Sequence, residues 1–321
     1  MSKNNRSTIS SMKAVRISNY GGIDALAYEN APRPRPGAGE VLIRVFSTSV
    51  NPFDCAVRAG YLSNYFSYTL PLILGTDVSG VIESIGEGVT TFKHGDEVYA
   101  RAGVTRDGAY AEYVVVPASD VAIKPESLDH VHSAALPHAS LTAWQALFGL
   151  AHLTSGQSIL IHGAAGGVGH IAVQFARLFG AKVIGTASHN LDFLRELKVD
   201  QAIDYSSTRF EEVVEPVDIV LDTIGGDTLE RSWGLLKPGG ILISTVQQPS
   251  EETAAAHKVR QAMVFSTPPI GETLNVVAEL VDSGELKPQV SSVLALKEIR
   301  KAHKMIEGRH TRGKIVLQVA A

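Results

Sequence analysis

"SILIHGAAGGVGHIAVQFARLFGAKVIGTAS" occupies residues 158–188, and its pattern predicts a strand, a glycine-rich turn, a helix and a second strand. Glycines in such a turn let the backbone approach a pyrophosphate at the N-terminus of the following helix. Read as G-x-G-x-x-G, the turn carries Ala164 in the first position, with Gly163 just before it and Gly166 and Gly169 in the other two. A tight turn that binds nothing is the alternative, but the complete strand–turn–helix–strand unit favours a dinucleotide site.

The choice of dinucleotide is made at the end of the second strand of this unit. An acidic residue about 20 positions after the glycines holds the ribose 2′-hydroxyl of NAD in such units. Here that place is taken by Ala187, followed by Ser188, His189 and Asn190. A carboxylate there repels a 2′-phosphate, whereas small polar residues admit it. The sequence therefore predicts NADP(H), although the loop contains no arginine.

The chain has 321 residues, which suffice for two packed cores, and its sequence shows two different patterns. The first part has short β-rich runs broken by Pro and Gly, which predicts a mostly β, barrel-like domain. After His130 strands and helices alternate, which predicts right-handed βαβ units and a parallel sheet of the Rossmann, doubly wound α/β class. The last helix and strand return to the first domain. We expect a disordered tail at 1–11, the β domain at 12–128 and 285–321, and the nucleotide domain at 129–284.

Composition narrows the partners and the compartment. The net charge of −4 and the absence of a basic cluster with interleaved aromatics argue against nucleic acid. A single cysteine, Cys55, makes no internal disulfide, which favours a reducing compartment such as the cytoplasm. No apolar run reaches the roughly 18 residues of a membrane span, and the start MSKNNRSTISS lacks the apolar core of a secretory signal.

Seven motifs carry a resemblance to a known family: SVNPFD, LGTDVSGVIESIGEGV, GDEVYA, GAYAEYVVVP, ALPHASLTAWQAL, HGAAGGVG and RGKIVL. With these the chain resembles, from Met12 to its C-terminus, the zinc-independent quinone oxidoreductases of the medium-chain dehydrogenase/reductase superfamily, the branch that includes zeta-crystallin. The resemblance implies a GroES-like fold for the β domain. It also implies NADPH-dependent reduction of quinones, or of the activated double bond of α,β-unsaturated carbonyls.

The resemblance also places the positions of catalytic zinc. Zinc alcohol dehydrogenases of the superfamily carry Cys, His and Cys where this chain has Asn51, Thr76 and His138. Zinc catalysis needs about three protein ligands and an open position, and only His138 is a good ligand. A metal-free site is therefore expected, with His138 either a packed or pocket-lining residue or a stray ligand. Cys55 is expected to be a small buried hydrophobe rather than a nucleophile.

Without a metal, the acceptor must already be activated. An electron-poor quinone or enone accepts hydride from NADPH with mainly positioning and modest polar help. Asn51 and Asp54 are expected to line the nicotinamide side, with Asn51-Pro52 as a plain turn the alternative. Either hydroxyl of Tyr61 and Tyr65 is a candidate to protonate or orient a carbonyl, and core packing is an equal alternative for each.

The resemblance further implies cofactor contacts. Thr142 matches a hydroxyl that contacts the nicotinamide half, and Ser188 and Tyr205 match places near the adenosine phosphate, although Tyr205 is equally an ordinary strand-end aromatic. Asp222 either contacts a ribose or caps the turn before two glycines. The full predicted set is Asn51, Thr142, Gly163, Gly166, Gly167, Val168, Ser188, Tyr205 and Lys314.

Assembly and function leave alternatives. The strand GGILISTV and the segment running to VFSTPP form an expected sheet edge, which invites pairing with a second copy, so a homodimer is predicted. A small-molecule quinone or enone is the expected substrate. A non-enzymatic NADPH-binding protein with a sensing or interaction role is an alternative that the fold permits. An alcohol dehydrogenase is a second alternative function.

Overall fold

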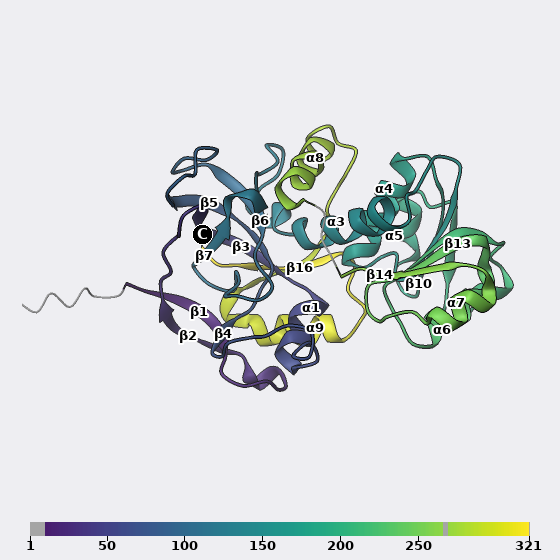
Figure 1. Cartoon of the computed structure of the whole chain (residues 1–321), viewed down its shortest axis with the longest axis horizontal. Helices are drawn as coiled ribbons and strands as arrows, with labels where there is room; N and C mark the ends of the chain where they lie inside the picture. The colour runs from purple at the N-terminus through teal and green to yellow at the C-terminus, as the bar shows by residue number, and fades with distance from the viewer. Residues whose placement is uncertain (1–9, 266–268, 321) are drawn as a thin grey trace, which may run out of the picture.

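A mostly β domain and a nucleotide-binding domain lie side by side in the computed structural model, which describes residues 10–265 and 269–320 (Figure 1). The purple and blue N-terminal part and the yellow C-terminal end share the β domain, while the teal and green middle of the chain forms the other. Residues 1–9 of the predicted tail lie outside the described residues. The first strand begins at Ser11, the last residue of that tail.

The nucleotide-binding domain is built on a six-stranded sheet in the order β11-β10-β9-β12-β13-β14, with every neighbouring pair parallel. Counted along the chain this order is 3-2-1-4-5-6, the Rossmann arrangement. The order reverses between β9 and β12, so ligands bind beyond the carboxyl ends of these strands. The strands are β9 (Ser158–Ile161), β10 (Lys182–Ala187), β11 (Gln201–Asp204), β12 (Val217–Asp222), β13 (Leu236–Ser244) and β14 (Arg260–Met263).

Both faces of this sheet are covered, because its strands are apolar on both sides. Ile159 and Ile161 pack into one buried cluster and Leu160, between them, packs into another. The helical segment before β9 consists of α2, α3 and a π-helical segment, η3. The helices are α2 (His130–Ser133), α3 (Pro137–Trp144), η3 (Gln145–Leu150), α4 (Gly167–Leu178), α5 (Leu191–Glu196), η4 (Phe210–Glu212), α6 (Asp227–Ser232), η5 (Trp233–Leu235), α7 (Glu251–His257) and α8 (Ile270–Asp282).

The β domain contains a sheet in the order β15-β16-β3-β5-β6-β8, with β7 also paired to β3, and a second sheet in the order β2-β1-β4. Its strands are β1 (Ser11–Ile17), β2 (Ala27–Pro32), β3 (Glu40–Val50), β4 (Leu72–Ile73), β5 (Asp77–Ile85), β6 (Glu97–Arg101), β7 (Tyr113–Pro117), β8 (Val121–Ile123), β15 (Val290–Ala295) and β16 (Lys314–Gln318). Its helices are η1 (Ile23–Ala25), α1 (Pro52–Ala59), η2 (Ala118–Asp120), η6 (Leu296–Glu298) and α9 (Ile299–Glu307).

The pairing of β16 with β3 positions the site. These strands run antiparallel, and Ile315 lies opposite Val50. Lys314 precedes Ile315 and Asn51 follows Val50, and because the strands are antiparallel both residues lie at the same end of the pair. Among the described residues, no helix is long and apolar enough to cross a membrane.

Candidate active site

The glycine-rich turn joins β9 to α4 and exposes one face. Gly163 has a left-handed φ of +67°, and a Cβ on Gly169 would lie 2.2 Å from the carbonyl oxygen of Gly163, so neither position accepts a side chain without strain or displacement. Gly163, Gly166, Gly167 and Val168 are partly accessible, whereas Ala164, Ala165 and Gly169 are buried. The four residues predicted to hold the pyrophosphate thus form the accessible surface of this turn, at the N-terminus of a 12-residue helix.

The C-terminal segment lies directly against this turn. The Gly313 N–H donates to the carbonyl of Ala165 at 2.8 Å, and Gly313 pairs with Gly166 as an isolated parallel bridge. A Cβ on Gly167 would lie 2.9 Å from Cδ of Lys314. The stem of Lys314 therefore borders the pyrophosphate turn.

The ammonium of Lys314 is held in a buried cluster with Asn51 and Asp77. Nζ donates to Oδ1 of Asn51 and lies 3.1 Å from Oδ2 of Asp77, and the Lys314 and Asp77 side chains are 3% and 0% exposed. Burial raises the pKa of Asp77, but Lys314 and the hydrogen bonds of Ser49 and Asn51 outweigh it and hold that pKa below its usual value. Asp77 stands in a quoted motif but received no role in the sequence analysis, because its partner is distant in the chain.

Asn51 makes three side-chain hydrogen bonds inside this cluster. Its Nδ2 donates to Oδ2 of Asp77 at 2.8 Å and to Oγ1 of Thr76 at 3.2 Å, while its Oδ1 accepts from Lys314. An amide has two N–H groups, so both donors are used. The side chain is buried. In this structure Asn51 orients its neighbours, and a hydrogen bond from it to substrate or cofactor stays a prediction.

Asp54 takes part in the cap of a helix. It is residue N3 of α1, and its Oδ2 accepts the Asn51 N–H and the Tyr110 hydroxyl, both at 2.8 Å. Burial raises its pKa to about 7, despite these hydrogen bonds. With Asn51 as N-cap and Pro52 as the first helical residue, the Asn51-Pro52 pair begins a helix. Asp54 therefore positions α1 in this structure, and its catalytic role stays a prediction.

The three positions that carry zinc ligands in related enzymes do lie together. Oγ1 of Thr76 is 3.2 Å from Nδ2 of Asn51 and 3.4 Å from Nδ1 of His138. Burial first, and then Arg101, lower the pKa of His138 to about 3, so its ring is neutral. Thr142, one turn further along α3, donates its hydroxyl to the His138 carbonyl at 2.7 Å and retains acceptor capacity for the nicotinamide half.

This donor set does not fit a zinc ion. The only oxygen of the Asn51 side chain already accepts from a cation, the hydroxyl of Thr76 is a poor ligand, and His138 alone offers a ring nitrogen. Within residues 10–265 and 269–320, no group of three or more His, Cys, Asp or Glu side chains is placed to hold a metal.

The two predicted tyrosines differ in their surroundings. Tyr61 is 78% exposed and Tyr65 is 65% exposed, so neither packs into the core. The Tyr65 ring lies 5.6 Å from Phe265, which follows β14 in the other domain. Tyr65 thus bridges the two domains, whereas no ring contact places Tyr61 there among the described residues.

Aromatic side chains that the sequence analysis missed border His138. The Phe53 ring, on α1, lies 5.9 Å from the His138 ring and 6.3 Å from the Phe66 ring. They form an apolar wall next to the Asn51 cluster. The signal was present in the FD of SVNPFD, but the side to which Phe53 turns depends on where α1 begins.

The adenosine end of the site gathers residues from three segments. Ala187 ends β10, and its carbonyl accepts from the Tyr205 N–H at 3.2 Å, so Ser188 and Tyr205 lie at adjacent strand ends. The rings of His189 and His310 are 5.4 Å apart. The loop lacks an arginine, but Arg312 reaches the following helix from the C-terminal segment, where it stacks on Phe193 at 4.1 Å and pairs with Glu196 at 2.7 Å.

Two remaining candidates have structural roles. Oδ1 of Asp222 accepts the N–H groups of Ile224 and Gly225 at 3.0 and 2.9 Å, so this carboxylate caps the turn. Cys55 is buried, and burial raises the pKa of its thiol, which fits the predicted inert role. Its Sγ lies 3.3 Å from Nδ1 of His303, a partner 248 residues away that the sequence did not reveal.

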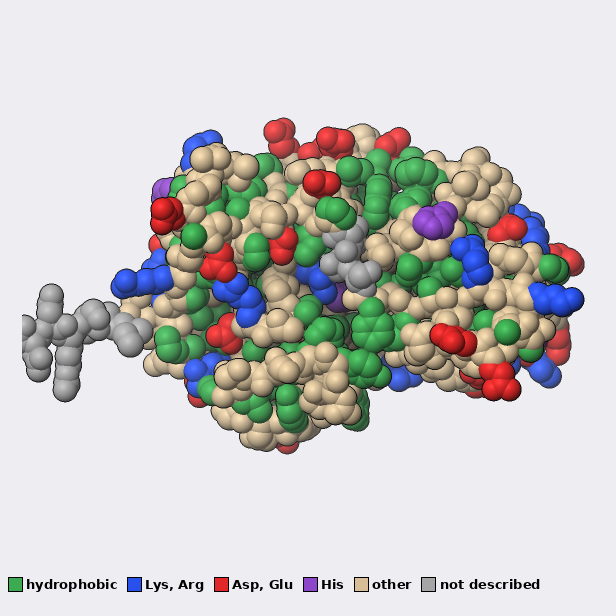
Figure 2. Space-filling model, viewed as in Figure 1, with side chains coloured by type: hydrophobic (Ala, Val, Ile, Leu, Met, Phe, Trp, Pro, Cys, Tyr) green, Lys and Arg blue, Asp and Glu red, His purple; other side chains and the backbone are tan. Residues whose placement is uncertain are grey.

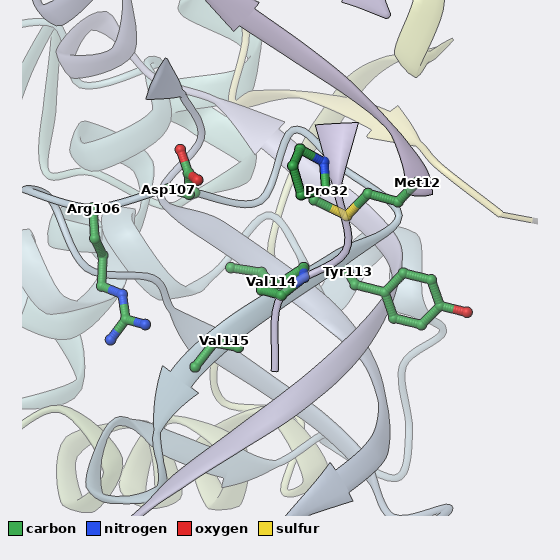
Figure 3. Close-up of a pocket in the computed structure, with 9 residues that line it drawn as sticks. Met12, Pro32, Arg106, Asp107, Tyr113, Val114 and Val115 are labelled. Carbon is green, nitrogen blue, oxygen red and sulfur yellow. The ribbon is translucent and has the colours of Figure 1, made fainter. Parts of the chain in front are cut away.

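A pocket of about 240 Å³ lies apart from this site, in the β domain. Met12, Pro32, Tyr113 and Val115 are among its lining residues, which come from three strands and two loops (Figure 3). Arg106, also in the lining, is paired with Glu40 at 2.6 Å. The space-filling view shows positive and negative side chains mixed across this face of the molecule, with no large area of one sign (Figure 2).

Comparison with known proteins agrees with this architecture. Residues 37–126 match the model of an alcohol dehydrogenase GroES-like domain, and residues 197–317 match that of a zinc-binding dehydrogenase. The NAD(P)H oxidoreductase RTN4IP1, mitochondrial, of Danio rerio is 33% identical over 96% of this chain and 91% of its own length. The NADPH-dependent alkenal/one oxidoreductase, chloroplastic, of Arabidopsis thaliana is 33% identical over 95% of this chain and 79% of its own length.

A solved structure extends the likeness to the whole fold. The quinone oxidoreductase of Coxiella burnetii has a TM-score of 0.89 and 34% sequence identity, and the alignment covers 97% of this chain and 100% of that one. The predicted GroES-like and Rossmann combination is confirmed. The chain is an oxidoreductase that belongs to the zinc-independent quinone oxidoreductase branch of the medium-chain dehydrogenase/reductase superfamily, whose members bind NADP(H).

Proposed function

We propose that this protein transfers hydride from NADPH to quinones, or to the activated double bond of α,β-unsaturated carbonyls, without zinc. The observation that carries the proposal is the hydrogen-bonded row Asn51, Thr76 and His138, which occupies the zinc-ligand positions and leaves no set of metal donors. Oxidation of an unactivated alcohol needs help with a developing alkoxide, whereas an electron-poor acceptor needs mainly positioning.

Each part of the site supports one requirement of this reaction. When bound, NADPH supplies the hydride. The accessible face formed by Gly163, Gly166, Gly167 and Val168 suits its pyrophosphate. Thr142 retains acceptor capacity toward the carboxamide of the nicotinamide, and the wall of Phe53 and Phe66 offers an apolar surface to a flat acceptor.

The names of the relatives point the same way at a coarser level. An alkenal/one oxidoreductase and a quinone oxidoreductase are both among the similar proteins. A preference for NADPH is supported by Ala187, which carries no carboxylate to repel a 2′-phosphate. A homodimer formed at the β14 edge and a cytoplasmic location stay predictions, and some relatives are mitochondrial by name.

The test is the oxidation of NADPH by the purified protein with a panel of 1,4-quinones and enones, before and after chelation. We expect turnover with at least one acceptor class, unchanged after chelation, and no oxidation of simple alcohols with NADP⁺. Tight NADPH binding without turnover of any acceptor would replace the proposal with the sensing or interaction alternative. Alcohol oxidation lost on chelation would replace it with a zinc alcohol dehydrogenase.

A further inference from the structure

His138 is anchored at the start of α3 by two hydrogen bonds of its backbone. Its N–H donates to Oδ1 of Asp77 at 2.6 Å, and its carbonyl accepts the hydroxyl of Thr142 at 2.7 Å. The side chain is only partly buried. Its ring faces Phe53 at 5.9 Å, on the side of the apolar wall.

A chain of hydrogen bonds determines which ring nitrogen of His138 carries the proton. Lys314 donates to Oδ1 of Asn51, which turns the amide so that Nδ2 donates to Oγ1 of Thr76. The hydroxyl hydrogen of Thr76 is then free to point to Nδ1 of His138, 3.4 Å away. We take this hydroxyl to donate, which makes Nδ1 the acceptor and places the ring proton on Nε2.

The charge of the ring is set by its surroundings. The groups that act on it are Arg101 and Lys314, which oppose a positive ring, and Asp77, which favours one. Burial is the largest influence, and together they lower the pKa of His138 to about 3. The imidazole is neutral at every pH at which the enzyme is expected to work.

We propose that the Nε2–H of His138 donates a hydrogen bond to the carbonyl oxygen of the acceptor, which makes His138 a catalytic residue. Among the described residues, none accepts a hydrogen bond from Nε2. A neutral donor that faces an apolar wall stabilises negative charge more strongly than water does, because the local dielectric is low and the donor is already oriented. This inference rests on the proposed function.

In an enone, the electron pair of the hydride is passed through the conjugated system to the carbonyl oxygen. Hydride from NADPH forms a C–H bond at the β-carbon and leaves NADP⁺. The π pair of the double bond moves to join the α-carbon to the carbonyl carbon, and the carbonyl pair moves to the oxygen, where negative charge develops. Nε2–H stabilises this oxygen without giving up its proton, and solvent protonates the α-carbon. In a quinone, hydride added to the ring carbon β to this carbonyl gives an enolate on the same oxygen, which takes a proton from solvent. The carbon that received the hydride then loses a proton to solvent and the second carbonyl oxygen gains one, which gives the hydroquinone.

The test compares His138→Leu and His138→Gln with the wild type. His138→Leu should lower kcat/KM for enones by about 100-fold, the usual effect of losing one oxyanion donor, while the Kd of NADPH stays within about twofold. His138→Gln keeps an N–H donor and should recover part of the loss. The loss should be larger for enones with a more basic carbonyl oxygen, whereas a packing defect lowers the rates of all acceptors equally.

A second pair of variants tests the orientation of the ring. Thr76→Val removes the hydroxyl that fixes Nδ1 as acceptor and should lower kcat by about 10-fold, and Thr76→Ser should restore most of it. Nitrogen-15 NMR of the wild type should show the proton of His138 on Nε2. The inference is overturned if the ring proton of His138 is on Nδ1, or if His138→Leu has the same kcat/KM as an active wild type. Either result leaves the proposed function standing. A wild type without turnover of any quinone or enone defeats both.

Discussion

The Lys314 ammonium lies 3.1 Å from Oδ2 of Asp77, and the two residues are 237 positions apart in the chain. They meet because β16 pairs with β3, which brings the end of the chain beside Asn51. Both charges are buried, and each has further hydrogen bonds, so the pair is compensated. A buried pair of this kind adds little net stability but becomes costly when one partner is removed.

Lys314→Met should therefore destabilise the protein by about 3–5 kcal/mol, because it leaves the carboxylate of Asp77 buried without its cation. The double variant Asp77→Asn with Lys314→Met should regain part of that loss. Urea unfolding followed by fluorescence measures both values. A double variant no more stable than Lys314→Met alone contradicts the ion-pair interpretation.

The fold was predictable because its signals are local. The strand–turn–helix unit around Gly163 and Gly169 identifies the first βαβ unit, and alternation of strands and helices after His130 predicts the rest of the parallel sheet. The π-helical segment Gln145–Leu150 was not predicted, because apolar periodicity does not distinguish it from an α-helix. The division of the segment from α2 to η3 into separate helices depends on how its residues pack.

The site was predictable only in part, because its decisive contacts are distant in sequence. The residues of the pyrophosphate turn were identified from one segment, but Asp77 and Lys314 come from opposite ends of the chain. Composition near Asn51 does not show that its amide is held by three partners. The partnership of Cys55 with His303 was hidden for the same reason.

Ala187→Asp should shift the cofactor preference from NADPH toward NADH by about 1–3 kcal/mol of discrimination. The new carboxylate would stand at the carboxyl end of β10, where it repels a 2′-phosphate and accepts from a ribose hydroxyl. The measurement is the ratio of kcat/KM for NADPH and NADH with one quinone. Gln157→Glu is the matched control, because it adds a carboxylate just before β9, at the opposite end of the sheet. An unchanged ratio in Ala187→Asp would contradict this assignment.

Zinc is expected at well below one ion per chain in the purified protein. Asn51 and Thr76 stand at ligand positions, and the oxygen of Asn51 already accepts from an ammonium. Elemental analysis measures the content, and NADPH oxidation is compared before and after dialysis against a chelator. Stoichiometric zinc whose removal abolishes activity would refute the metal-free site.

The strand β14 ends the nucleotide-binding sheet and is the expected contact between two copies of the chain. Sedimentation velocity should therefore show a mass of about twice 34.3 kDa. Met263→Asp places a charge on this edge and should shift the equilibrium toward the monomer, whereas Lys182→Asp, on β10, should not. A wild-type monomer at all protein concentrations removes the prediction.

Acid should destabilise the protein steeply, because several histidines are buried in neutral form. Burial, the largest influence on each, lowers the pKa of His138, His162 and His303 to about 3 and that of His170 to about 4. In the unfolded chain such groups bind a proton near pH 6.5. Below this pH the unfolded chain therefore holds more protons than the folded one, and the unfolding free energy falls from about pH 6.5 toward pH 4.

One carboxyl opposes this trend. The folded-state pKa of Asp54 is raised to about 7, so between about pH 4 and 7 the folded chain keeps a proton that the unfolded chain releases. This group alone would make the protein less stable as the pH rises through that window. Burial lowers the pKa of His130 as well, so five histidines act against one carboxyl and acid destabilisation prevails; about three or more protons should be taken up on unfolding near pH 5.

Urea unfolding at a series of pH values from about 5 to 7 measures this proton uptake as the slope of the unfolding free energy. His162→Gln should reduce the uptake by about one proton, because Gln can still bond Thr186 and Ser232, which hold the His162 ring at 3.1 and 2.9 Å, but does not titrate. His94→Gln is the matched control, since His94 is exposed. Asp54→Asn should make the acid dependence steeper by removing the opposing carboxyl. A stability that is flat over this range, or one that rises on acidification, would show that these histidines are not held neutral in the folded protein.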